Sequence, residues 1–379
     1  MSFKVVLIIL TILIFVCASL LISVVWIKRN QAHREKRRRK DIKKISPFLK
    51  KLFAAETVDF FKNSEQSLSI LAAELDDKFS LQTLEDMLLD ILEYGGGETK
   101  VRARTIAYYF GYPEKCLSMI RERLTGNIAI GCRKAGLYQY GDAIPGIMKV
   151  LAIVSSETQL QAMMALARIG NTAAMLEAFD KIYRLILVNE RTVNEILCAF
   201  AGNRLELFKK MIHHQSEYLV RLFLKAMDQE IANQLIEDII QLFKKGGKET
   251  RLACIIAIGK SGNSRKNYML VHALGDKEWE IRATAAKTLG NLADPDAIAA
   301  LAKAARDREW WVRQNAVSSI LTYPSREEIL ISIAETGDKY AYDSMQYTLG
   351  KANERRLLSR IKEVWSKEDE STILKKIAS

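Results

Sequence analysis

Residues 276–290 read Asp-Lys-Glu-Trp-Glu-Ile-Arg-Ala-Thr-Ala-Ala-Lys-Thr-Leu-Gly, and much of this pattern returns once more before residue 321. Six residues recur at an offset of 31: Asp276, Trp279, Ile281, Arg282, Ala285 and Leu289 become Asp307, Trp310, Val312, Arg313, Ala316 and Ile320. A helical unit of about 30 residues cannot bury its apolar face alone and must stack on its neighbours. The stretch therefore predicts an array of helix–turn–helix repeats.

The same period extends upstream, where glycines stand at intervals of 30, 29 and 32 residues and are each expected to close a helix: Gly111, Gly141, Gly170 and Gly202. With only 5 prolines and 19 glycines in 379 residues, a turn-rich β-sandwich or β-barrel is disfavoured. We therefore expect an all-α protein. A helical cap at residues 46–97 would begin at Ser46-Pro47 and end at a run of three glycines. An α-solenoid of about eight to nine helix pairs would fill residues 98–379, most clearly at 246–322.

Near the N-terminus an uncharged run extends from Val5 to Ile27, and it would span roughly 34 Å as a helix. That length fits a membrane crossing and exceeds the apolar part of most cleaved signal peptides, which is the alternative. Ten Lys and Arg residues follow within 28–44. These observations predict a transmembrane anchor at 1–27 and a basic juxtamembrane segment at 28–45. By the positive-inside rule, the N-terminus would lie outside and the solenoid in the cytoplasm, at the inner membrane.

The net charge of +12 is unevenly distributed. Residues 28–44 carry +8, so residues 45–379 carry only +3, which disfavours nucleic acid as a partner. The basic segment sets topology, and it is also expected to contact anionic lipid head groups. The residues assigned to that contact are Arg34, Lys36, Arg37, Arg38, Arg39 and Lys40.

The units quoted above, together with Ala293-Asp-Pro-Asp-Ala-Ile298, resemble the short HEAT-like repeat found in phycobilin lyases. The resemblance is strong over 246–322 and weaker over 98–205. It implies a fold but no particular activity, because the motif is structural in proteins of very different function. By this resemblance, Arg282 and Arg313 would pair with Asp residues of their own or neighbouring units and form a ladder. Anion binding by the same arginines is the alternative.

A helical wheel places Ile281, Ala285 and Leu289 on the core face of the second helix and Lys287 opposite them. Counting back three residues from each closing glycine, Tyr108 and Tyr138 take the position of Lys287. Trp311 also lies off the core face, one residue after Trp310. Tyr108, Tyr138 and Trp311 are therefore candidate partner-binding residues, unless loops or terminal helices cover them. Trp279 and Trp310 are expected to pack within the repeats.

Patterns that carry chemistry are missing from the sequence. Gly259-Lys260-Ser261 lacks the first glycine of a phosphate-binding loop, and the adjacent His213 and His214 point to different helix faces. We therefore expect no catalytic residue, cofactor, metal or small-molecule substrate. The predicted function is a non-catalytic, membrane-anchored cytoplasmic scaffold for a protein partner, such as a membrane-bound enzyme complex. The alternative is an enzyme on a HEAT-like scaffold, either a chromophore lyase or a DNA glycosylase.

Overall fold

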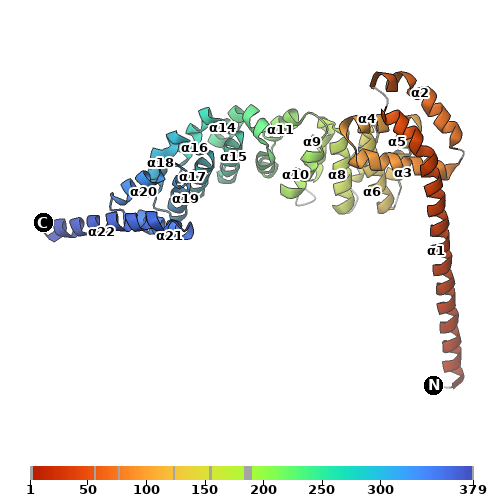
Figure 1. The fold of residues 1–379 in the computed structure, drawn as a ribbon, viewed down its shortest axis with the longest axis horizontal. Coiled ribbons are helices and arrows are strands. Elements are labelled where there is room, and N and C mark those ends of the chain that lie inside the picture. The colour runs from red at the N-terminus through yellow and green to blue at the C-terminus, as the bar shows by residue number, and fades with distance from the viewer. Residues whose placement is uncertain are drawn as a thin grey trace. The chain divides into compact units, whose positions relative to one another are not determined.

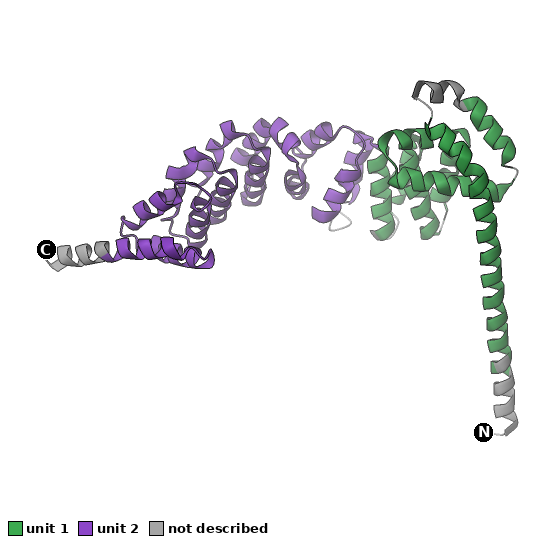
Figure 2. Cartoon of the chain, in the orientation of Figure 1, with its two compact units in different colours: residues 1–169 green, residues 170–379 purple. Residues whose placement is uncertain are grey.

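A computed structural model describes the backbone of residues 3–54, 57–75, 77–122, 124–152, 156–182 and 190–377. Within these ranges it describes all side chains except those at 3–11, 14, 57–64, 156 and 367–377. Every regular element in the described ranges is helical, and within each of two compact units successive helices pack on one another (Figure 1). The all-α prediction is confirmed. The chain forms two compact units, Met1–Ile169 and Gly170–Ser379, which are described separately below (Figure 2).

Unit 1 begins with a long helix and continues with shorter ones. Its helices are α1 (Phe3–Ala54), α2 (Thr57–Glu74), α3 (Lys78–Tyr94), α4 (Gly97–Tyr109), α5 (Tyr112–Ile120), α6 (Thr125–Tyr138), α7 (Ile144–Val150) and α8 (Ser156–Ile169), with the 3-10 helix η1 (Gly141–Ala143) before α7. The expected break at the three glycines is present, because α3 ends at Tyr94 and α4 begins at Gly97.

The predicted membrane anchor is wrong. Of the helices in the described part of the chain, none combines the length and the apolar character that a bilayer crossing requires. The side chains from Val5 to Thr11 lie outside the described residues. The predicted orientation and inner-membrane location rested on this anchor and are withdrawn with it.

The expected helix start at Ser46-Pro47 is also wrong, because Pro47 lies inside α1. Proline removes one backbone donor and normally breaks a helix interior at a cost of about 3 kcal/mol. Here the flanking residues Ile45, Leu49 and Leu52 are all buried in the core of unit 1. Burial of such side chains contributes roughly 1.5–3 kcal/mol each, which is enough to hold the helix continuous across the proline.

Unit 2 contains the repeats from which the fold was predicted. Its helices are α9 (Thr172–Ile182), α10 (Glu190–Ala199), α11 (Arg204–Met211), α12 (Glu217–Ala226), α13 (Gln229–Gln234), α14 (Ile236–Lys245), α15 (Lys248–Ser261), α16 (Tyr268–Ala273), α17 (Trp279–Leu292), α18 (Ile298–Ala304), α19 (Trp310–Ile320), α20 (Arg326–Ala334), α21 (Lys339–Lys351) and α22 (Arg355–Ile377), with the 3-10 helices η2 (Ser264–Lys266) and η3 (Pro295–Ala297). Helices α15, α17 and α19 begin 31 residues apart, as the sequence period requires.

The second helices of successive units pack directly on one another, α15 on α17, α17 on α19 and α19 on α21. Small residues permit the closest approaches. A Cβ atom added to Gly290 on α17 would lie 2.4 Å from the Cβ of Ser319 on α19. Gly136 plays the same part in unit 1, where an added Cβ would lie 2.7 Å from the Cα of Ala165. Both distances are shorter than the contacts that real Cβ atoms make. The close spacing of these helices therefore requires a residue without a side chain at Gly290 and at Gly136.

We expect Gly290→Ala to lower the free energy of unfolding by roughly 1–3 kcal/mol, because α17 and α19 must separate to admit the methyl group. The matched control is Gly350→Ala on α21, where an added Cβ meets nothing within 4 Å. That exchange should be neutral or stabilising by up to about 1 kcal/mol. Urea denaturation of both variants measures the difference, and equal stabilities would contradict the close packing described here.

Candidate functional site

An ion pair between neighbouring repeat units occupies the turns before α17 and α19. The guanidinium of Arg282 on α17 donates from Nε and Nη2 to the carboxylate of Asp307, at 2.7 and 2.8 Å. Its Nη1 donates to the carbonyl oxygen of Asp276 at 2.8 Å. The two side chains of the pair are 6% and 14% exposed. Asp307 also accepts the backbone N–H of Glu309 at 2.9 Å, which satisfies a donor at the start of α19.

The neighbouring steps of the ladder differ. One unit earlier, Arg251 pairs with Asp276, which accepts the N–H of Glu278 in the same way. One unit later, Arg313 donates to the hydroxyl of Ser344 at 3.0 Å instead of to a carboxylate. The pairing expected for Arg282 is therefore present, whereas Arg313 has a serine partner. Since the donors of Arg282 are already engaged, the alternative of anion binding at this side chain has no support in the geometry.

The structure separates the candidate tyrosines. Tyr108 is 43% exposed and makes an edge contact with Tyr140, with ring centroids 6.2 Å apart. Tyr138 is fully buried, and its hydroxyl donates to the carboxylate of Glu85 at 3.0 Å. Lys134 pairs with the same carboxylate oxygen at 2.7 Å. Burial, together with the charge of Glu85, raises the pKa of Tyr138, so its hydroxyl remains a donor. The expectation that Tyr138 is exposed is wrong.

The error arises from the position taken as the end of α6. The residue with positive φ that ends this helix is Gln139 (φ 54°), two residues before Gly141. In the neighbouring helices the corresponding residues are Gly111 and Gly170. Counting from Gln139, the equivalent of Tyr108 is Gly136 and not Tyr138.

Trp311 belongs to a group of exposed aromatic rings on unit 2, called here the aromatic surface. Its members are Trp310, Trp311, Tyr340 and Tyr347, with exposed fractions of 36, 55, 68 and 50%. The Trp310 ring meets Trp311 edge-on at 4.7 Å and Tyr347 at 5.4 Å between centroids. Trp310 was expected to pack within the repeat. Its ring contacts Trp311 and Tyr347 and is 36% exposed to solvent. Trp279, one unit earlier, is 37% exposed.

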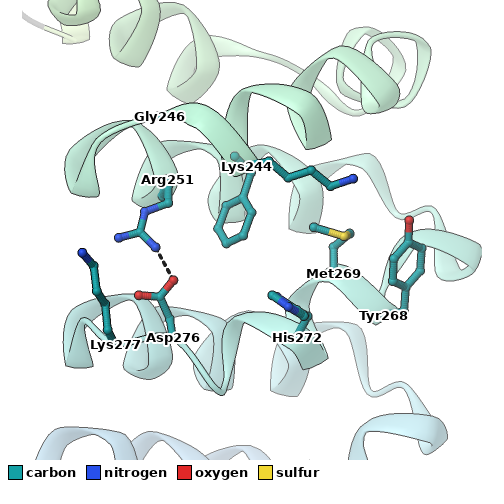
Figure 3. A pocket seen from close by; sticks show the side chains of 9 residues that line it. Lys244, Gly246, Arg251, Tyr268, Met269, His272, Asp276 and Lys277 are labelled. Atoms are coloured by element: carbon teal, nitrogen blue, oxygen red, sulfur yellow. Dashed lines mark hydrogen bonds and ion pairs between the residues drawn. The ribbon is translucent and has the colours of Figure 1, made fainter.

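A separate pocket of about 600 Å³ opens between α14, α15 and α16 (Figure 3). Phe243 and Met269 supply apolar surface, Lys244 and Lys277 lie at its sides, and the Arg251–Asp276 ion pair lies at one end. This pocket was not predicted from the sequence, because its residues come from separate helices and turns that are brought together only in the folded chain.

The metal-ligating residue types and the buried cysteines in the described part of the chain do not form known kinds of metal and nucleophile site. No group of three or more His, Cys, Asp and Glu residues there could hold a metal ion. Burial raises the pKa of the thiols of Cys116, Cys132 and Cys254 to about 12, so all three are protonated and poor nucleophiles at neutral pH.

The basic residues assigned to lipid contact all lie exposed on α1. Two of them have partners within unit 1: Arg39 pairs with Glu35 at 2.5 Å, and Arg37 pairs with Asp77 and lies over the ring of Phe79. Arg37 therefore contributes to packing between α1 and α3. Lipid contact by this segment stays a prediction.

We expect Arg282→Ala to lower the free energy of unfolding by roughly 1–3 kcal/mol, because it leaves the largely buried carboxylate of Asp307 without its main partner. Arg282→Lys should recover only part of this loss, since an ammonium cannot donate in two parallel directions. Arg265→Ala, at an exposed arginine of η2, is the control and should change stability by less than about 0.5 kcal/mol. Thermal denaturation in which Arg282→Ala matches the control would show that the pair is not structural.

The same pair predicts a pH dependence. Burial alone would raise the pKa of Asp307, but the hydrogen bonds from Arg282 and the N–H of Glu309 outweigh it and hold the pKa below the ordinary 3.8. A lowered pKa in the folded state stabilises the fold above the unfolded-state pKa, and this contribution is lost as pH falls through the folded-state pKa. Asp307→Asn should therefore be less stable than wild type at pH 7. The gap should narrow below pH 3.8 when both are titrated with urea, and a constant gap would contradict the assignment.

Comparison with known proteins agrees with the repeats described above. Residues 206–321 match the family model for HEAT repeats. A search of curated proteins found no match.

Two solved structures were compared with the chain as a whole. The CpcE–CpcF complex of phycocyanin lyase from Nostoc sp. PCC7120 is 12% identical, with a TM-score of 0.26, covering 68% of this chain and 94% of that one. YibA of Escherichia coli is 14% identical, with a TM-score of 0.31, covering 74% and 92%. At these scores neither likeness carries an argument about this chain. The family match and the repeat geometry together identify HEAT-like repeats within residues 206–321.

Proposed function

We propose that this protein is a non-catalytic scaffold that binds a protein partner through the aromatic surface of unit 2. The observation that carries the proposal is the contact group formed by Trp310, Trp311 and Tyr347, which leaves large ring areas open to solvent. Tryptophan and tyrosine are the side chains most enriched at binding hot spots, since a rigid ring buries much area at a small cost in entropy.

The repeat architecture supports this proposal, because stacked helix pairs supply a rigid frame on which exposed side chains keep fixed positions. The pair of Arg282 and Asp307 fixes the turn before α19, and the Trp310 and Trp311 side chains project from the first turn of that helix. A preorganised surface of this kind loses little conformational entropy when a partner binds. The proposal does not include a membrane anchor.

We expect the double variant Trp311→Ala with Tyr347→Ala to reduce recovery of the partner by at least tenfold in quantitative affinity purification of the full chain. Loss of two hot-spot rings removes on the order of 2 kcal/mol or more of binding free energy. Because both rings are half exposed, the melting temperature should change by only a few degrees.

The matched control is Tyr94→Ala with Leu124→Ala, which removes two side chains of unit 1 that are 83% and 68% exposed. It should retain every partner that wild type retains. Equal recovery with both double variants would contradict the proposed surface, and a large fall in melting temperature for the first would show that its rings belong to the core.

A further inference from the structure

The pocket between α14, α15 and α16 carries an excess of positive charge. Asp276 is the one carboxylate that lines it, and that carboxylate already accepts from the guanidinium of Arg251 and from the N–H of Glu278. Lys244 and Lys277 also line the pocket, and both are exposed. Within the described residues neither lysine has a carboxylate within ion-pair distance. The pocket thus presents two ammonium groups whose charge is not matched locally.

The same pocket also has apolar surface. Phe243 and Met269 both line it and are each 5% exposed, while Tyr268, which also lines it, is 56% exposed. An apolar wall between cationic side chains matches a ligand that combines an apolar group with flanking negative charges. A bare polyphosphate chain has no apolar group to place against this wall, so an acidic peptide with apolar side chains fits the lining better than a polyphosphate does.

A second cavity of about 620 Å³ lies on the other side of α16 and shares His272 with the first. Its carboxylates are again engaged, Asp307 by Arg282 and Asp338 by Arg306 at 3.5 Å. Lys303 lines this cavity and is exposed. Exposed lysines therefore line both cavities, Lys244 and Lys277 the first and Lys303 the second.

We propose that the pocket between α14, α15 and α16 binds an acidic segment of a partner protein, with carboxylates at Lys244 and Lys277 and an apolar side chain against Phe243 and Met269. The inference deepens the proposed function, because it rests on the scaffold role and names the chemistry of one bound segment. It depends on side chains separate from the aromatic surface.

The test uses the purified full chain and a fluorescein-labelled Asp-Glu-Leu-Phe-Glu-Asp peptide in fluorescence polarisation. We expect Lys244→Glu with Lys277→Glu to weaken binding at least tenfold. Lys287→Glu with Lys362→Glu makes the same charge change at exposed lysines of α17 and α22 and should stay within twofold of wild type. Replacing Leu-Phe by Ser-Ser in the peptide should weaken binding at least fivefold, and circular dichroism checks that each variant is folded.

Three results would overturn the inference: no binding of the peptide by wild type, equal weakening in the two double variants, or equally tight binding of a twelve-nucleotide oligothymidine. Failure of this test and failure of the proposed function are distinguishable. Loss of peptide binding leaves partner recovery through Trp311 and Tyr347 unaffected, whereas an inert aromatic surface leaves the peptide result standing.

Discussion

The two-pronged ion pair between Arg282 and Asp307 joins consecutive repeat units at the point where the chain turns into the second helix. Each carboxylate in this ladder does two things at once. It holds the arginine of the preceding unit, and it accepts a free backbone N–H at the start of its own second helix. The same carboxylate groups therefore set both the geometry of the turn and the distance between stacked units, so a change in the turn also changes the stacking.

The Arg and Asp side chains of the ladder neutralise one another. Neighbouring residues can therefore differ between units while the helix pairs remain stacked in the same way. The position of Glu280, which pairs with Lys248 at 2.5 Å, is occupied by Trp311 in the next unit. In a repeat protein, function is carried by such variable positions on an invariant scaffold. The side chains proposed to contact partners, Trp311 and Tyr347 on one surface and Lys244 and Lys277 on the other, are not members of the ladder, although its Arg251–Asp276 pair lines the pocket.

The sequence period was sufficient to predict the helical repeats. Pairing of Arg282 with an Asp was expected from the resemblance to HEAT-like repeats, and the structure shows that its partner is Asp307 of the next unit. Prediction from the sequence failed where tertiary packing overrides a local signal. Pro47 lies inside α1 because its neighbours are buried, and Gln139 adopts the left-handed conformation that a glycine was expected to provide. Because the end of α6 was expected at Gly141, Tyr138 was predicted to be exposed, whereas it is buried. The pocket of Figure 3 gave no sequence signal, because lysines on separate helices show no spacing rule.

The end of the ladder and the aromatic surface occur in the same repeat, and the two are physically linked. Where the earlier units place an arginine, this unit places Ser344, and among the described side chains Arg313 has no carboxylate partner. Its guanidinium instead lies over the ring of Tyr340, 5.3 Å from the centroid. A cation over an aromatic face recovers part of the lost electrostatic stabilisation, by about 0.5–1 kcal/mol at an exposed site. The ring that does so is itself 68% exposed. Replacing the ion pair by an aromatic contact therefore keeps Arg313 positioned and at the same time leaves the ring of Tyr340 on the surface proposed for partner binding.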